Sequence, residues 1–417
     1  MEVRDKARRA RRPPGTLYPT KGWTPMRTRL SALLLAPLFL LMAGCNDHLV
    51  LTPSEDASFH HRPGHGGGGD GDGGAEGSYE VILLGTSGSA WAGNRAGVVV
   101  GEWSPDGQLG AFVWTEAEGV LELEDVGGAR DLNEGGTLTG FSFSQGGFVY
   151  DLPTSALTLL PPLPGHTSTN GIAINDDGWV GGRSSGTLDS GASDWQTVVW
   201  IPDADGGYGA PYDLQCPAMQ LWMDVNQGGD VVANGCAGSS WSPPHLWIWN
   251  GEGYDAPIAL GTLGGSGSTY AISMDDRGRV AGFSTTSGST SERRAVLWHP
   301  DDYGTPIDLG SADLVTDMSN GNQVVGYRSA RSGDIVVIWT VDDAGNVIAV
   351  QELPSVSGYK DAHSLGITDE GWIVGRAMSS SETMAVVWRP LEDGGDGGDE
   401  DEDGDCDPHP RFPERCR

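Results

Sequence analysis

Basic residues are scarce in this chain. Its 417 residues include 25 Lys and Arg against 57 Asp and Glu, which gives a formal net charge of −32. Residues 1–44 contain nine Lys or Arg and two Asp or Glu, so the remainder carries −39. A body this acidic repels nucleic acid and anionic lipid headgroups. We therefore expect no nucleic-acid partner and no basic patch that attaches the protein to a membrane.

Motifs of common catalytic sites are also missing. The sequence has no P-loop, no H-E-x-x-H and no dinucleotide-binding fingerprint. Gly182–Gly186 matches G-x-S-x-G, but a nucleophile elbow requires a strand that runs into a helix. Here the motif enters a Ser/Gly-rich loop with no helical pattern behind it. We interpret the match as coincidence and predict no catalytic residue.

The apolar run Leu30–Leu41 is too short to cross a bilayer. Two arginines precede it, and an Ala-Gly pair stands directly before Cys45. Together these features resemble a bacterial lipoprotein signal, which implies cleavage of residues 1–44 and lipidation of Cys45. An ordinary secretory signal that contains a cysteine is the alternative. Met26 would begin a compact signal, so we expect the true start there.

The lipoprotein signal implies a place for the protein in the cell. We expect it to be in the cell envelope, lipid-anchored to a membrane and exposed to the periplasm or the exterior. Membrane contact would then come from the lipid on Cys45.

Cysteine is rare, with five residues in all. Apart from Cys45, the cysteines fall into two local pairs, Cys216 with Cys236 and Cys406 with Cys416. This spacing predicts two small disulfide loops in an oxidising compartment. Zinc binding is the alternative, but no C-x-x-C supports it, so we predict no metal site.

Composition separates the remaining chain into three parts. Residues 46–78 are rich in Gly, His and Asp, and we expect a flexible tether that cannot bury a core. Residues 391–417 begin with a run of carboxylates and are expected to form a disordered acidic tail. Clustered carboxylates at 401–405 give a weak possibility of Ca²⁺ binding, and we expect no other cofactor. Residues 79–390 are left as the folded domain.

Glycine is abundant at 65 residues, and it marks a repeat in residues 79–390. A turn glycine or its substitute is followed four residues later by a small residue, and a turn-starting polar residue stands three positions before it. An apolar run that ends in a large aromatic residue follows each of these hairpins. The turn-starting residues are Asn94, Asn133, Asn175, Asn226, Asp275, Ser319 and Thr368, and the aromatic residues are Trp114, Tyr150, Trp200, Trp249, Trp298, Trp339 and Trp388.

The repeat predicts an all-β fold, a single β-propeller. Four short strands per unit, a period of roughly 40–50 residues and a recurrent Trp are typical of propeller blades. Seven units are present, and the last lacks a fourth strand, which Glu80–Gly85 supplies before the first unit. We therefore expect seven four-stranded blades closed by an N-terminal strand. An open β-solenoid and two stacked sandwiches are the alternative folds.

Two stretches carry a family resemblance. Leu260–Gly265 with the hairpin after it, and Gly110–Trp114, resemble the extracellular HAF-type repeat of bacterial surface and secreted proteins. The resemblance covers roughly residues 80–390. It implies an extracytoplasmic repeat domain, and the family has no general biochemical activity to carry over.

Propeller geometry assigns the loops to two faces. The face with the hairpin turns should be densely acidic, with Asp pairs at 176–177, 275–276, 301–302 and 342–343. The opposite face should gather most cations and loop tryptophans, and loops on a rigid scaffold often carry function. The candidate ligand-binding residues on that face are Trp103, His166, Arg183, Trp195, Trp241, Arg293, Arg328, His363 and Arg376.

Exposed Trp beside Arg suits an acidic glycan or a protein partner. We therefore expect a monomer with a binding or structural role at the cell surface and no catalysis. The alternative is an extracytoplasmic lyase or hydrolase that acts on polysaccharide through the same face. That alternative needs two acid/base residues that converge near the central channel.

Deletion of Tyr79–Gly85 tests the predicted closure. It should expose the edge of the last unit and destabilise the whole ring, because an unpaired strand edge leaves its backbone groups unsatisfied. Thermal unfolding of the deletion variant measures the effect. An unchanged melting temperature would rule out closure by this strand.

Overall fold

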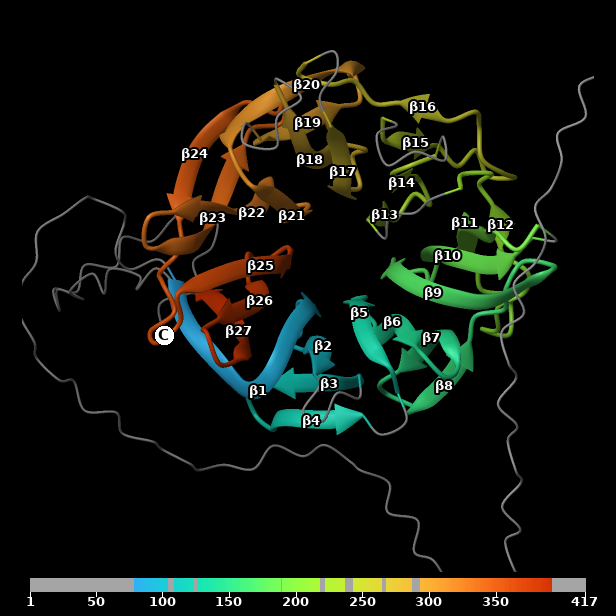
Figure 1. The fold of residues 1–417 in the computed structure, drawn as a ribbon, viewed down its shortest axis with the longest axis horizontal. Helices are drawn as coiled ribbons and strands as arrows, with labels where there is room; N and C mark the ends of the chain where they lie inside the picture. Colours follow the sequence, from blue (N-terminus) through green and yellow to red (C-terminus); the bar gives the residue numbers. More distant parts are fainter. Residues whose placement is uncertain are drawn as a thin grey trace, which may run out of the picture. The chain divides into compact units, whose positions relative to one another are not determined.

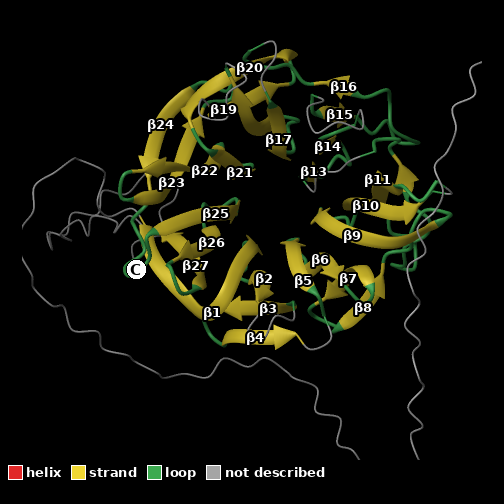
Figure 2. Ribbon diagram, viewed as in Figure 1, coloured by secondary structure: helices red, strands yellow, loops and turns green. Residues whose placement is uncertain are grey.

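A computed structural model describes residues 79–103, 109–123, 126–188, 190–217, 222–236, 243–264, 268–286 and 293–391. They form strands and connecting loops (Figure 2). No helix long and apolar enough to cross a membrane occurs among them. Four residues singled out above lie outside these ranges, as do the predicted tether and acidic tail; they are Cys45, Trp241, Cys406 and Cys416.

Most strands belong to four-stranded antiparallel sheets in which neighbours follow one another along the chain. The first two sheets are β5 (Gly128–Leu132), β6 (Thr137–Ser142), β7 (Gly146–Asp151), β8 (Ala156–Leu159), and β9 (His166–Ile174), β10 (Val180–Thr187), β11 (Ser193–Trp200), β12 (Tyr212–Asp213). The next are β13 (Met223–Val225), β14 (Val231–Ala233), β15 (His245–Trp247), β16 (Ile258–Ala259), and β17 (Thr269–Met274), β18 (Val280–Thr285), β19 (Arg293–His299), β20 (Asp302–Ser311). The last is β21 (Leu314–Met318), β22 (Gln323–Ala330), β23 (Gly333–Val341), β24 (Val347–Glu352).

One larger sheet joins the two ends of the domain. Its order is β25 (Asp361–Ile367), β26 (Ile373–Met378), β27 (Thr383–Pro390), β1 (Tyr79–Gly93), β2 (Val99–Trp103), β3 (Gly110–Thr115), β4 (Gly119–Leu123). The first half of β1 pairs with β27 and its second half pairs with β2. The register shifts between Leu83 and Ser87, where Gly85 has a φ of 75°. A single long strand therefore serves two neighbouring sets of strands.

The sheets are arranged radially around a central axis (Figure 1). In each set of neighbouring strands, the strand that comes first along the chain faces the centre. A central cavity of about 360 Å³ is lined by residues of these strands, β1, β5, β9, β13, β17, β21 and β25, and of the turns that follow them. This arrangement is a β-propeller, which confirms the predicted fold class.

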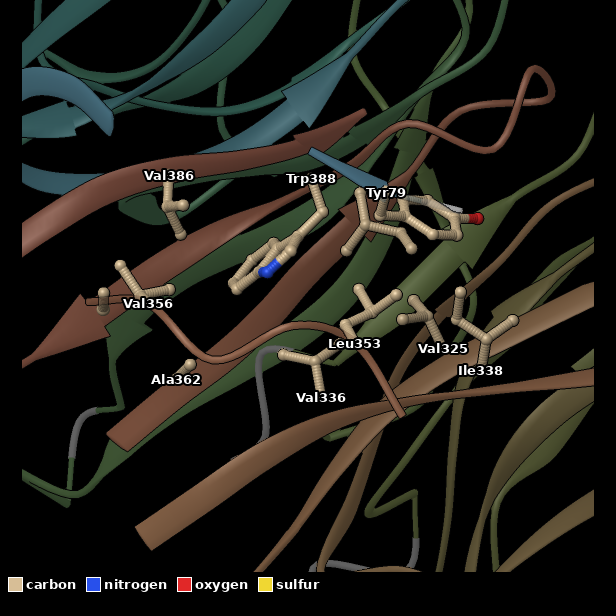
Figure 3. Close-up of a cluster of buried hydrophobic side chains, with 11 residues drawn as sticks. Tyr79, Val325, Val336, Ile338, Leu353, Val356, Ala362, Val386 and Trp388 are labelled. Atoms are coloured by element: carbon tan, nitrogen blue, oxygen red, sulfur yellow. The ribbon is translucent and has the colours of Figure 1, made fainter. Parts of the chain in front are cut away.

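Hydrophobic clusters between neighbouring sheets hold the ring together. One cluster joins β22 and β23 to β26 and β27, and it includes Tyr79 at the start of β1 (Figure 3). Since both faces of the middle strands are buried in this way, their sequences are apolar runs without alternation. Val99 and Val100, for example, are both fully buried although they point to opposite faces of β2.

The recurrent tryptophans are core residues. Trp200, Trp298, Trp339 and Trp388 are each at most 1% exposed. Three of them also donate their indole N–H to a carbonyl of the chain segment that enters their own sheet; the acceptors are Pro161, Gly261 and Pro354, at 2.8–3.1 Å. Each of these tryptophans thus combines a large apolar contact with a hydrogen bond.

The predicted aromatic residue of the fourth unit was wrong. Trp247, and not Trp249, occupies the repeated position, because Trp247 pairs with Val231 as Trp298 pairs with Val280. Trp249 lies two residues further along, where it packs edge-to-face on Trp179 at 5.0 Å. Two tryptophans at the same strand parity cannot be distinguished before the register is known.

A β-bulge recurs in the inner strands, opposite the small residue of the repeat. The extra residue interrupts the register between an inner strand and the second strand, and it lies at the cavity wall. A Cβ on the opposing glycine would lie 2.0–2.3 Å from a carbonyl oxygen of the inner strand. The bulged residues are Trp91, Arg130, Ile172, Ile272, Thr316 and Leu365, opposite Gly101, Gly140, Gly182, Gly282, Gly326 and Gly375.

The one strand pair without this glycine supports the link between glycine and bulge. The pair β13–β14 has Ala233 at the small position, and there Met223 pairs directly with Ala233 without a register shift. The glycine is therefore required by the bulge, because the carbonyl of a bulged strand approaches too closely for any side chain.

Gly282→Ala should destabilise the protein by about 3 kcal/mol, because overpacking against backbone cannot relax through a side chain. Its Cβ would lie 2.0 Å from the Tyr270 carbonyl oxygen. Gly209→Ala is the matched control, since no atom lies within 4 Å of a Cβ there. Urea unfolding measures both variants, and equal midpoints would show that the close approach is not a constraint.

Candidate functional site

The central cavity has two differently built ends. The turn side carries the hairpin turns that start at the repeated polar residues named above, and the loop side is the opposite end of the strands. Side chains at the two ends differ in charge and in whether their hydrogen bonds are satisfied.

Asparagine side chains link neighbouring turns on the turn side. The Oδ1 of each accepts the backbone N–H four residues on, which closes its own hairpin as the sequence predicts. The Nδ2 donates to the backbone oxygen of the turn-starting residue in the next sheet, at 2.9–3.3 Å. These residues are Asn94, Asn133, Asn175 and Asn226.

Where the turn-starting residue is Asp275, two arginines make the contacts with the next turn. The Asp275 side chain has no N–H to donate, and Arg277 donates instead to the backbone oxygen of Asn320, the residue after the turn-starting Ser319, at 2.7 Å. Arg279, only 1% exposed, binds the Asp275 carboxylate and donates to Asn322 Oδ1, both at 2.7 Å. This buried ion pair is fully hydrogen-bonded, as a buried charge requires.

The side chains one position after the turn-starting residues form a second ring. Each accepts the backbone N–H of the equivalent residue in the preceding sheet, at 2.8–3.3 Å. Glu370 closes this ring by an ion pair with Arg95 at 2.7 Å. The acceptors are Glu134, Asp176, Gln227, Asp276, Asn320 and Asp369. The acidic residues of the turn-side mouth therefore hold the ring together.

Three partly buried aspartates, Asp131, Asp224 and Asp317, lie between the two ends. Each accepts the N–H of its own following residue and, through Oδ2, a backbone N–H of the next sheet at 2.7–2.9 Å. Burial raises the pKa of all three, and mutual repulsion adds to the effect; the pKa of Asp317 reaches about 7. Among the described residues, no group of three or more His, Cys, Asp or Glu is arranged to hold a metal ion.

The candidate residues predicted on the loop side lie in strand segments at that end. The structure brings them together as two groups and leaves Trp103 apart, partly buried in a hydrophobic cluster. The first group is His166, Arg183 and Trp195 on β9, β10 and β11, with the guanidinium of Arg183 5.3 Å from the Trp195 ring centre. The second group is Arg293, Arg328, His363 and Arg376 on β19, β22, β25 and β26.

His363 of the second group stacks on Tyr327, which also lies within reach of the charges of Arg293 and Arg376. Tyr327 and His363 lie parallel with ring centres 3.8 Å apart, and His363 Nε2 lies 2.8 Å from Asp334 Oδ2. Burial lowers the pKa of His363, and the positive charge of Arg376 opposes protonation further. Burial alone would raise the pKa of Asp334, but the hydrogen bonds from His363 and a serine lower it.

Sequence reasoning missed Arg130 and Trp91, which lie at the loop-side end of the cavity. Both are bulged residues, and the guanidinium of Arg130 lies 4.1 Å from the Trp91 ring centre. Arg130 forms an ion pair with Glu102 at 3.1 Å. Burial lowers the pKa of Arg130, and the nearby charge of Arg376 adds to the effect. Their shared position, three residues before a turn-starting asparagine, was the available signal.

Unsatisfied polar atoms gather on the loop side. Eight buried side-chain nitrogen or oxygen atoms have no hydrogen-bond partner among the described residues, and only Ser319 Oγ belongs to the turn side. Such groups are uncommon in native proteins, and each calls for an explanation. The others are Trp91 Nε1, Glu102 Oε2, Gln196 Oε1, His245 Nδ1, Arg328 Nε, His363 Nδ1 and Arg376 Nε; of these, Glu102 Oε2 is the oxygen that forms the ion pair with Arg130.

Ser184, His166 and Asp194 form a hydrogen-bonded row that resembles a catalytic triad. His166 Nδ1 lies 2.9 Å from Ser184 Oγ, and its Nε2 lies 3.3 Å from Asp194 Oδ2. However, Ser184 is fully buried within β10, and its oxygen accepts the Leu163 N–H. Ser284 is equally buried and accepts the equivalent N–H in another sheet. The serine of the G-x-S-x-G match is therefore a structural residue of the repeat.

Solved structures of low sequence identity are similar to this chain in fold. The β-propeller domain of the Trilobed protease from Pyrococcus furiosus, described as having an open velcro topology, is 10% identical over 77% of this chain and 100% of that one, with a TM-score of 0.45. A puromycin hydrolase S511A mutant complexed with PGG is 12% identical over 74% of this chain and 54% of that one, with a TM-score of 0.51. The polysaccharide lyase Uly1 is 8% identical over 74% of this chain and 91% of that one, with a TM-score of 0.43.

These identities show the fold alone. No protein-family model and no curated protein sequence matches the chain. The resemblance to the HAF-type repeat therefore stays a prediction.

The raised pKa values of Asp131, Asp224 and Asp317 predict that stability depends on pH. A carboxyl whose folded pKa is raised binds more protons in the folded state, so stability falls as pH rises from the unfolded value of 3.8 towards about 7. Asp317→Asn should therefore reduce the loss of stability between pH 5 and pH 8, by up to about 1.4 kcal/mol per pH unit.

Urea unfolding across this pH range measures the difference between the variant and the unmodified protein. Histidines with lowered pKa values, His245 and His363, have the opposite pH dependence but are common to both proteins. Asp177→Asn, at an exposed position, is the control and should leave the pH profile unchanged. Parallel profiles for Asp317→Asn and the unmodified protein would contradict the prediction.

Proposed function

We propose that the protein is a non-catalytic binding protein whose ligand is an acidic glycan at the loop-side mouth of the central cavity. The observation that carries this proposal is the set of unsatisfied buried polar atoms on the loop side of the sheets, which includes Trp91 Nε1 at the wall of the central cavity, together with the arginines stacked on aromatic rings. An acceptor-rich ligand would satisfy the N–H groups among these atoms.

The chemistry of the mouth favours negative charge. Arg130, Arg183 and Arg293 lie 4.1–5.3 Å from the ring centres of Trp91, Trp195 and Phe283. The edge of a stacked guanidinium matches the geometry of a carboxylate or sulfate, although Arg130 already uses part of its edge for Glu102 and Arg293 donates to the Asp313 carbonyl at 3.0 Å. Because the cations form separate groups on different sheets, a polymer with charges repeated along its length suits them better than a single small anion.

Polysaccharide lyase activity is the alternative, and one observation favours it. Tyr327, His363 and Arg376 lie together, with Asp334 orienting the histidine. An acid–base pair beside an arginine is what proton abstraction next to a uronate carboxylate requires. However, His363 is only 9% exposed, and burial raises the pKa of Tyr327, so that its phenol group stays protonated at neutral pH and cannot act as the base.

We also propose that the ring has seven blades and closes through its N-terminal strand. The pairing of Tyr79–Leu83 with β27 supports closure, since it adds a fourth strand to β25, β26 and β27. The second half of β1 is then the inner strand of the set that contains β2, β3 and β4.

A place in the cell envelope, with a lipid anchor on Cys45, is part of the same proposal. The disulfide Cys216–Cys236, predicted from spacing, is present in the structure and is consistent with an oxidising compartment. A ligand outside the cell is then accessible to the domain.

Arginine variants at the mouth test glycan binding. Arg130→Gln and Arg376→Gln should each weaken binding to an acidic polysaccharide such as polygalacturonate about tenfold or more, because each removes a charge-assisted contact. Biolayer interferometry on immobilised polysaccharide measures affinity, with a neutral glucan as the control ligand.

Arg95→Gln is the matched control, because Arg95 is an exposed arginine on the turn side. It should bind like the unmodified protein. An equal loss in Arg95→Gln, or no binding to acidic polysaccharide by the unmodified protein, would overturn the proposal. Release of unsaturated sugars, seen as ultraviolet absorbance, would decide for the lyase.

A further inference from the structure

A second cavity, of about 450 Å³, lies between β12 of one sheet and the β15–β16 hairpin of the next. Both β12 and β16 are the last strands of their sheets, at the outer edge of the ring (Figure 1). The cavity is separate from the loop-side mouth and shares no lining residue with the central cavity. The lining residues that matter here are Tyr212, Asp213, Gln215, Trp247, Tyr254 and Asp255.

Aromatic rings form much of its wall. Tyr212, which is 42% exposed, packs edge-to-face on Trp249 at 5.5 Å and lies 6.1 Å from Tyr254. Trp249 in turn packs on Tyr254 at 5.1 Å. Because these rings support one another, an exposed aromatic face at Tyr212 is held in place in the absence of any ligand.

The hydroxyl groups of this wall are already engaged. Tyr254 donates its O–H to the Gly229 carbonyl at 2.9 Å, and Tyr212 donates to the Glu252 carbonyl at 3.4 Å. The tyrosines therefore present rings to the cavity while their O–H donors point to the protein.

The polar groups of the cavity are mainly acceptors. Asp213 Oδ1 accepts the Gln215 N–H, and Asp255 Oδ1 accepts from the Asn250 amide, both at 2.8 Å. The other oxygen of each carboxylate has no hydrogen-bond partner among the described residues. Among the described residues that line the cavity, none is Lys or Arg. Burial and the nearby negative charge of Asp230 raise the pKa of Tyr254, so the surroundings are negative as well.

The wall that carries Tyr212 and Asp213 is fixed. Leu214 donates its N–H to the Thr197 carbonyl, and the Thr197 N–H is bonded to the Cys216 carbonyl. Cys216 is also held by its disulfide to Cys236. Gln215 has a φ of 54°, a conformation that costs free energy for a residue with a side chain and that the surrounding bonds maintain.

We propose that this cavity binds a small organic cation with a quaternary ammonium group. Aromatic faces attract a cation through their quadrupoles, and carboxylates with free oxygens neutralise it without the need for an N–H donor on the ligand. A neutral sugar can donate hydroxyl groups to the same carboxylates, but it carries no positive charge for the carboxylates and the ring faces to stabilise. The proposal does not depend on glycan binding at the loop-side mouth.

Isothermal titration of the full chain with choline tests the proposal. Choline should bind, and its uncharged isostere, with a tert-butyl group in place of the trimethylammonium group, should bind at least about tenfold more weakly, because only the cation gains from the rings and the carboxylates. Equal binding of the two, or no binding of choline at millimolar concentration, would overturn the proposal. Binding of a neutral sugar at this cavity in place of choline would do the same.

Variants locate the site. Tyr212→Ala, Asp213→Asn and Asp255→Asn should each weaken choline binding about tenfold, whereas Tyr212→Phe keeps the ring and should bind normally. The asparagine variants preserve shape and the Oδ1 hydrogen bonds, so their folding is not at risk. Phe143→Ala removes a ring that is 85% exposed elsewhere and should have no effect. Unchanged affinity in both asparagine variants and in a folded Tyr212→Ala would place any choline binding outside this cavity.

Discussion

Hydrogen bonds between the hairpin turns of neighbouring sheets are the interaction on which this structure depends. Hydrophobic packing between sheets is not directional, and it would tolerate sliding of one sheet on the next. Each turn-starting asparagine donates through Nδ2 to a backbone oxygen of the adjacent sheet, and Asp131, Asp224 and Asp317 each accept a backbone N–H of the adjacent sheet through Oδ2. The positions of the inner strands are therefore fixed to within the narrow range of distances that a hydrogen bond allows. At Asp275, Arg277 and Arg279 bond instead to Asn320 and Asn322 of the next sheet, whereas Ser319 Oγ has no hydrogen-bond partner among the described residues, so the link varies around the ring.

The same geometry couples the scaffold to the candidate site. A bulge in the inner strand puts one extra residue at the wall of the central cavity, and a glycine on the second strand makes room for it. Since the closest atom to each glycine is a backbone carbonyl oxygen of the inner strand and not an atom of the bulged side chain, that side chain is unconstrained by this contact. That freedom is seen in its variety, which ranges from Arg130 and Trp91 to Ile272 and Thr316. The repeat thus keeps the backbone constant and varies the residue that faces the cavity.

The fold could be predicted from the sequence because the residues that identify each repeat lie close together along the chain. Turn glycines, the polar residues before them and the buried tryptophans each depend on a single hairpin or strand. Arg130 and Trp91 were not found because a bulge is a property of two paired strands, and its position depends on a register that the sequence does not state. For the same reason Trp249 was taken for Trp247. The loop-side residues were placed at the correct end of the strands, but their division into two groups depends on contacts between sheets.

At the two mouths of the cavity, the charged side chains differ in whether their hydrogen bonds are made within the protein. On the turn side, Glu134, Asp176 and Asp276 accept backbone N–H groups of the preceding sheet, and their charges are therefore part of the scaffold. On the loop side, the guanidinium groups of Arg328 and Arg376 keep a buried N–H without a partner among the described residues. An unsatisfied buried donor costs folding free energy, so its retention is explained most simply by a gain outside folding. The many acidic side chains of the turn side are therefore explained by their contribution to stability. The few cationic side chains of the loop side are the better indicator of a ligand.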